Sequence, residues 1–94
     1  MRIRVGQIVD YRLSVEEAFA ITSMRYHKPP TGNLIDSYRS SDVQAGGLHP
    51  LLVTRVWDGG LVNGQLFLDG NDNFWITAAV EGTGPRSWSW PKEE

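Results

Sequence analysis

Cysteine is absent from the 94 residues of the chain. This absence excludes a disulfide framework and a thiolate metal site, and it makes a reducing cytosol the expected compartment. Histidine is scarce as well, because only His27 and His49 occur, and a zinc site built on them would need carboxylates that no spacing supplies. The sequence therefore predicts neither a bound metal nor a cofactor.

Long apolar runs are also missing. The N-terminal stretch MRIRVGQIVDYRL carries charges at positions 2, 4, 10 and 12, so it is neither a signal peptide nor a membrane span. The formal net charge is −2, from nine basic and eleven acidic residues scattered along the chain. Because affinity for nucleic acid depends on clustered positive charge, we expect no long nucleic acid and no membrane as partners.

Catalytic signatures are the third absence. The chain has no G-x-S-x-G nucleophile elbow, and Gly59, Gly60 and Gly64 lie between predicted strands instead of opening a helix, so they build no phosphate-binding loop. The adjacent acids Glu16 and Glu17 are explained by helix capping. These observations favour a protein that is not an enzyme.

One short stretch resembles a calcium-binding loop. Asp69-x-Asn71-x-Asn73 reproduces the first ligand positions of an EF-hand. Phe74 stands where that loop requires glycine, however, and Val80 stands where it requires the bidentate glutamate. The stretch is better interpreted as an Asn-rich hairpin turn.

The residues that are present predict one strand followed by one helix. Residues 7–13 alternate between apolar and polar, as in a strand that is covered mainly on one face. Ser14 and Glu17 have the spacing of a capping box, and Pro29-Pro30 forbids continuation, so we predict a helix over about residues 15–26. Its expected buried stripe consists of Val15, Ala18, Phe19 and Thr22.

The second half of the chain predicts four strands, over residues 50–57, 61–68, 74–80 and 87–90. Trp88 and Trp90 share one face of the last strand, which is more typical of a core than of a binding platform. We expect a single α+β domain over residues 1–94. Its sheet would be small, antiparallel and strongly curved, or a partly open β-barrel of about five strands, with one main helix at one end. A flexible loop is expected over about 29–47 and a charged tail over 92–94.

The hairpin formed by residues 61–82 raises the question of what its outer face does. On the second strand, the alternation places Phe74, Ile76, Ala78 and Val80 inward and Trp75, Thr77 and Ala79 outward. On the first strand, the outer set is Asn63, Gln65 and Phe67. This mixed polar and aromatic surface suits either a subunit interface or a platform on which a base stacks.

Four strings in this half carry a resemblance to known proteins. They are Val62-Asn63-Gly64-Gln65, Leu68-Asp69-Gly70-Asn71-Asp72, Trp75-Ile76-Thr77 and Trp88-Ser89-Trp90-Pro91. In this arrangement the chain resembles a group of small, mostly uncharacterised bacteriophage and prophage proteins. The resemblance implies a phage origin and action in the host-cell cytoplasm. By analogy of size and source, it implies a sponge that sequesters a cyclic nucleotide or cyclic ADP-ribose immune signal. The alternative is a structural virion component or a protein-binding adaptor.

For the sponge, the sequence suggests where a small anionic nucleotide would bind. Arginine suits phosphate oxygens and aromatic rings suit bases. The candidate residues, near a subunit junction, are Arg25, Tyr26, His27, Lys28, Tyr38, Arg39 and Trp75. A solvated loop is the other interpretation of the same residues. A small core and an exposed row of Phe67 and Trp75 further predict a homo-oligomer, most simply a dimer.

Overall fold

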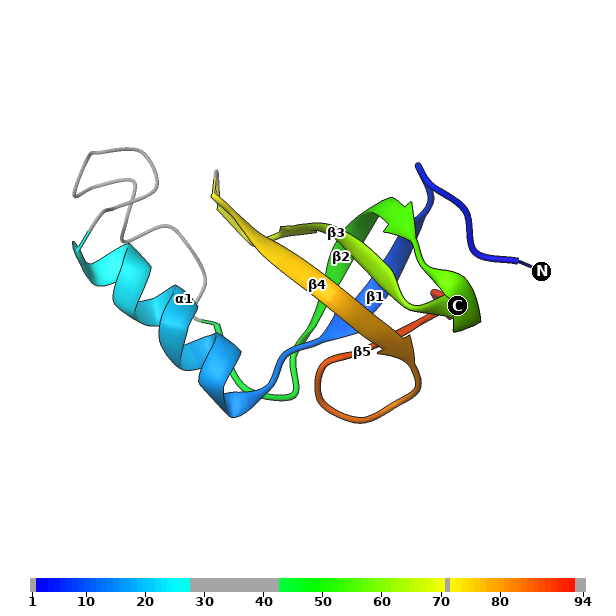
Figure 1. Cartoon of the computed structure of the whole chain (residues 1–94). Coiled ribbons are helices and arrows are strands. Elements are labelled where there is room, and N and C mark those ends of the chain that lie inside the picture. The colour runs from blue at the N-terminus through cyan, green and yellow to red at the C-terminus, as the bar shows by residue number, and fades with distance from the viewer. Residues whose placement is uncertain (1, 28–42, 71, 93–94) are drawn as a thin grey trace.

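A computed structural model describes residues 2–27, 43–70 and 72–92 of the chain (Figure 1). The elements in chain order are β1 (Ile8–Arg12), α1 (Val15–His27), β2 (Leu48–Val56), the short 3₁₀ helix η1 (Asp58–Gly60), β3 (Val62–Phe67), β4 (Asn73–Glu81) and β5 (Ser87–Ser89). The α+β class, the five-stranded barrel and the single main helix predicted from the sequence are confirmed.

The five strands close into a barrel in the order β1-β2-β3-β4-β5, and β5 pairs back to β1. Neighbouring strands are antiparallel except β4 and β5, which are parallel. One parallel pair is required, because an odd number of strands cannot close a ring with every neighbouring pair antiparallel. The parallel contact is short and joins only Val80 to Ser87 and Glu81 to Trp88.

The start of α1 is fixed by the capping box predicted from the sequence. The Ser14 hydroxyl accepts a hydrogen bond from the Glu17 amide at 3.1 Å, and the Glu17 carboxylate accepts one from the Ser14 amide at 3.0 Å. The other carboxylate oxygen accepts from the Tyr11 hydroxyl at 2.6 Å. One side chain therefore caps α1 and ties it to β1.

This tie also sets which face of α1 is buried. Ala18 and Ile21 join the core, whereas Val15 is 68% exposed and Phe19 is 74% exposed. The predicted buried stripe is therefore wrong except at Ala18. The bond from Tyr11 to Glu17 turns the face that carries residues 14, 18 and 21 toward the barrel, which rotates the apolar residues 15 and 19 into solvent.

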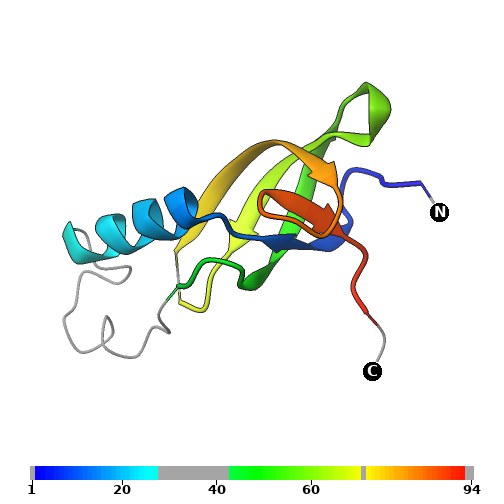
Figure 2. The ribbon, with the colours of Figure 1, turned by 90° about the horizontal axis from the view of Figure 1, so that it is seen from below.

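The core lies inside the barrel and under α1, which stands beside one end of the barrel (Figure 2). Its largest fully buried side chains are Trp88, Tyr11, Leu13, Ile21, Leu51, Leu66, Val9, Val53 and Val62. Trp90 packs edge-on against Trp88, with ring centroids 5.4 Å apart, so these two rings fill the core as predicted. Residues 43–47 turn back toward β1, where Leu13 exchanges backbone hydrogen bonds with Gly46 and Gly47.

The predicted inward and outward faces of β4 hold only for its first half. Ile76 is buried and Trp75 is 48% exposed, as expected. Beyond Ala78 the pattern reverses, since Ala79 is buried and Val80 is 47% exposed. The prediction for residues 78–80 is therefore wrong.

A β-bulge explains the reversal. Ala78 has a φ of 53°, and the register with β3 shifts by one residue opposite Asn63. The side-chain oxygen of Asn63 accepts from the Ala78 amide at 2.8 Å and from the Trp57 indole at 3.0 Å. An extra residue in one strand moves every later side chain to the other face. The short side chain of Asn63 is what holds that extra residue in place.

Candidate functional site

An open groove of about 460 Å³ lies between α1 and the first half of β4. α1 runs alongside the first half of β4 in Figure 1, and in Figure 2 the N-terminal end of the helix lies next to that strand. The groove is lined by Ser14, Glu16, Glu17, Ala20, Phe74, Trp75, Ile76, Thr77 and Arg86. It thus joins the start of the helix, four consecutive residues of one strand and the loop before β5.

The strand wall of the groove is largely aromatic and apolar. Trp75 is 48% exposed, and Thr77 on the same strand is exposed as well. Phe74 is half-buried and Ile76 is buried, so these two connect the groove to the core. Tryptophan with an accessible ring is a residue that protein interfaces use as an anchor.

The helix wall is acidic and open. Glu17 is occupied by its bonds to Ser14 and Tyr11, whereas Glu16 is exposed and has no hydrogen-bond or ion-pair partner among the described residues. Ala20 adds only a methyl group, which leaves room over β4. Burial, together with the bond and the charge of Glu17, raises the pKa of Tyr11 well above its usual range, although the nearby Arg86 opposes the shift.

A second tie holds the far end of α1. The Arg25 guanidinium donates from Nε to Asp72 Oδ2 at 2.8 Å and from Nη2 to Oδ1 at 2.9 Å. A longer bond of 3.4 Å reaches the Asp69 carbonyl. The hydrogen bond from Arg25 holds the pKa of Asp72 below its usual range. Because both side chains are mostly buried, this bidentate pair pins α1 to the turn between β3 and β4.

His49 lies close to this second tie. Burial lowers the pKa of the imidazole, and the positive charge of Arg25 lowers it further, while Asp69 opposes the shift. The imidazole is therefore more readily neutral than an exposed histidine.

Of the residues predicted to bind a nucleotide, the structure describes the side chains of Arg25 and Trp75. Trp75 lines the groove, whereas Arg25 forms the tie to Asp72 and is not among the groove-lining residues. The side chains of Tyr26 and His27, at the end of α1, lie outside the described part of the structure. So do the residues Lys28, Tyr38 and Arg39. Of these two described residues, only Trp75 lines the groove between α1 and β4.

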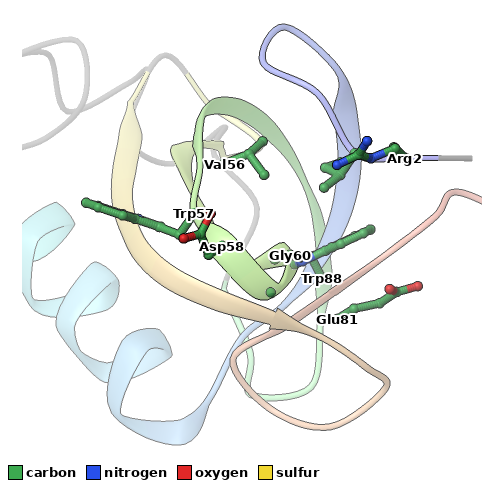
Figure 3. Close-up of a pocket in the computed structure, with 9 residues that line it drawn as sticks. Arg2, Val56, Trp57, Asp58, Gly60, Glu81 and Trp88 are labelled. Carbon is green, nitrogen blue, oxygen red and sulfur yellow. Dashed lines mark hydrogen bonds between the residues drawn. The ribbon is translucent and has the colours of Figure 1, made fainter.

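A second hollow of about 450 Å³ lies at the barrel end near η1 (Figure 3). It is lined by Arg2, Ile3, Val56, Trp57, Asp58, Gly59, Gly60, Glu81 and Trp88. Trp88 is buried there and donates its indole N–H to the Gly60 carbonyl at 3.1 Å. Arg2 and Glu81 lie on the side of Trp88, across from Asp58. Trp88 therefore has a structural role in this hollow, because its hydrogen bond to Gly60 holds the turn between β2 and β3.

The charged residues that line the two hollows indicate which ligands each hollow could bind. The groove combines two carboxylates with Arg86, and the second hollow combines two carboxylates with Arg2. Neither lining has an excess of positive charge. Among residues 2–27, 43–70 and 72–92, no group of three or more potential ligands is arranged to hold a metal ion.

In the described part of the chain, no helix has the length and apolarity needed to cross a bilayer.

Of the residues that line the groove, sequence reasoning placed only Trp75 among the ligand-binding candidates. Glu16 gives no separate signal, because an acid in the first turn of a helix is sufficiently explained by the helix dipole. Ala20 carries no chemical signal, although a small residue on a helix can mark space beside it. Arg86 lies in a Gly- and Pro-rich loop whose path no local pattern predicts.

Comparison of the chain with protein-family models, with curated proteins and with solved structures finds no match.

Proposed function

We propose that the chain is a phage-encoded, non-catalytic adaptor that binds a segment of a partner protein in the groove between α1 and β4. The observation that carries this proposal is that a half-exposed Trp75 lies across an open groove from Glu16, which has no partner among the described residues. Aromatic anchors rimmed by polar groups are typical of protein contact sites.

The ionisable groups around the groove support a role without catalysis. The carboxylate of Glu17 is occupied by the cap and by Tyr11. Tyr11 keeps its proton at neutral pH, because even the usual pKa of a tyrosine is about 10 and that of Tyr11 is raised further. A general acid or base needs a group that exchanges protons near the working pH, and these two groups are bound to each other instead.

The nucleotide sponge remains the rival proposal. The accessible ring of Trp75 supports it, because bases stack on such rings. Two observations favour the adaptor instead. Arg25 already forms a bidentate pair with Asp72, and the groove lining carries two carboxylates against one arginine, which disfavours phosphate.

A selection from a display library of random peptides of about nine residues, longer than an ordinary strand, tests the adaptor proposal. Peptides are selected on the wild type and counter-selected on Ala20→Trp, whose indole would fill the groove from the helix side. Thr22→Trp places the same side chain on an exposed position of α1 outside the groove and is the matched control. We expect peptides that bind the wild type and Thr22→Trp but not Ala20→Trp. A library without such peptides would reject the adaptor.

Titration calorimetry with cyclic dinucleotides and cyclic ADP-ribose isomers distinguishes the nucleotide sponge from the adaptor. The adaptor proposal predicts no saturable heat with the wild type. Saturable binding that Trp75→Ala and Arg25→Ala both abolish would replace the adaptor with the sponge.

The homo-oligomer is a further proposal. Phe67 is 41% exposed, and Trp75 lies on the neighbouring strand opposite Gln65. Burying this row against a second copy would shield two aromatic rings from water. Light scattering at micromolar concentration should give a dimer mass, and a monomer mass would reject self-association.

A further inference from the structure

We propose that the occupant of the groove is an extended segment that adds to the free edge of β4 as an extra strand, with a basic side chain against Glu16. This inference rests on the proposed adaptor function and states the chemistry of its partner. Main-chain hydrogen bonds would provide the affinity, and the side chains around the groove would provide the choice of sequence.

The lining of the groove shows that it follows a strand edge and not a sheet face. Successive side chains of a strand point to opposite faces, so a hollow over one face is lined by alternate residues. Here Phe74, Trp75, Ile76 and Thr77 all line the groove, although Ile76 points into the core and Trp75 points outward. Only a hollow that runs along the edge of β4 contacts all four.

The pairing of β4 shows that this edge is open. Phe74, Trp75 and Ile76 pair with β3 on one side, whereas β5 reaches only Val80 and Glu81 on the other. Within the described ranges, no strand pairs with residues 74–77 on the side of α1. In an antiparallel ladder, alternate residues direct their N–H and C=O groups away from the partner strand. Such unpaired groups form a template for another extended chain.

α1 covers this edge without closing it. Helices commonly shield an open strand edge, but the two ties, from Glu17 to Tyr11 and from Arg25 to Asp72, hold α1 at both ends. Between the ties Ala20 contributes only a methyl group, and a groove of about 460 Å³ remains. A helix fixed at both ends cannot readily collapse onto the strand, so the groove is preformed for one extended segment.

The charge of the groove indicates the sequence of that segment. Glu16 is exposed and unpartnered within the described part of the chain, and the protein carries a net charge of −2. A lysine or arginine that reaches Glu16 would form an ion pair beside the apolar surface of Phe74 and Trp75. The expected occupant is therefore a β-prone segment with one basic residue.

A second copy of the chain suits the groove less well. Its own β4 edge would bring a second α1 into the same place, together with another Glu16 and Glu17. Four carboxylates against two Arg86 guanidinium groups would then lie around one short strand pair, and this excess of like charge is unfavourable. An extended segment from a basic partner carries no such helix.

Backbone N-methylation of a selected peptide tests strand addition. Each amide of a peptide that passes the Ala20→Trp counter-selection is methylated in turn, and each dissociation constant is measured for the wild-type protein. Strand addition predicts a period of two, in which alternate methyl groups weaken binding at least about tenfold and the others change it little. Losses without that period would overturn strand addition while leaving the adaptor intact.

The basic side chain is tested with Glu16→Gln. We expect this variant to weaken binding by roughly three- to tenfold and to remove most of its salt dependence. Glu81→Gln, which neutralises an exposed acid outside the groove, is the matched control and should bind as the wild type does. Equal binding by the wild type, Glu16→Gln and Glu81→Gln would overturn the proposal that a basic residue of the partner contacts Glu16. A peptide-free dimer that Ala20→Trp dissociates would make a second copy the occupant and overturn the proposal.

Discussion

The two halves of β4 belong to one strand and yet present different edges. Residues 80 and 81 are paired with β5, which closes the barrel there. Residues 74–77 pair only with β3 among the described residues and leave their other edge toward α1. The difference shows that a barrel can be closed by its topology and still keep an open strand edge beside a helix.

The bulge at Ala78 separates these two halves. A bulge bends its strand and increases the local twist, so the second half can reach β5 while the first half diverges from it. Asn63 supports the bulge by accepting hydrogen bonds from Ala78 and Trp57. The candidate site therefore depends on a backbone irregularity that lies outside the groove itself.

The largest expected effect is on the free energy of unfolding, and it distinguishes a buried position in the first half of β4 from an exposed position in the second half. Ile76→Ala should lower the free energy of unfolding by about 2–5 kcal/mol, because it leaves a cavity at a core position that is 2% exposed. Val80→Ala removes a side chain that is 47% exposed and should change it by about 0.5 kcal/mol or less. Urea denaturation measures both. Equal losses would mean that the inward and outward faces of β4 are not as described.

Removing the support of the bulge should have the next largest effect. Asn63→Leu deletes the acceptor of two hydrogen bonds and should cost about 1–3 kcal/mol, since the Ala78 amide and the Trp57 indole lose their partner. Gln65→Leu, on the same face of β3, is the control. Thermal unfolding monitored by tryptophan fluorescence should report a larger loss for Asn63→Leu. The reverse order would contradict the assigned role of Asn63.

The tie between Arg25 and Asp72 should give a smaller, pH-dependent effect. Asp72→Asn should cost about 1–2 kcal/mol at pH 7, reduced by the partial exposure of the pair. The folded pKa of Asp72 is depressed, so its contribution is present above the usual carboxyl pKa of about 4 and is lost as the pH falls through the folded value.

Denaturation at a series of acidic pH values measures this contribution. The difference between wild type and Asp72→Asn should shrink toward low pH, whereas Asp58→Asn, at an exposed acid, should match the wild type throughout. A difference that stays constant with pH would contradict an ionic tie.

The smallest expected change is at the start of α1. Ser14→Ala should cost about 1 kcal/mol, because the Glu17 amide loses its acceptor. Thr22→Ala, on the exposed face of the same helix, is the control. A melting temperature for Ser14→Ala that equals the wild-type value would mean that Ser14 does not act as a cap.

The sequence was informative where a local rule decides the structure. The capping box at Ser14 and the Gly-rich turns depend on neighbouring residues, so the helix and the strands could be predicted. The parallel pairing of β5 and the bulge at Ala78 depend on closure of the ring and on Asn63, which is distant in sequence. The groove could not be predicted, because the distance between α1 and β4 is set by ties from Tyr11 and Asp72.

Amide hydrogen exchange, resolved by residue with NMR, tests the open edge of β4 most directly. In the free protein, the amides of residues 74–77 should alternate between slow exchange, where they face β3, and fast exchange, where they face α1. A selected peptide should slow the fast amides. Uniformly slow exchange across residues 74–77 in the free protein, or fast amides that the bound peptide leaves unchanged, would contradict a free edge that accepts a strand.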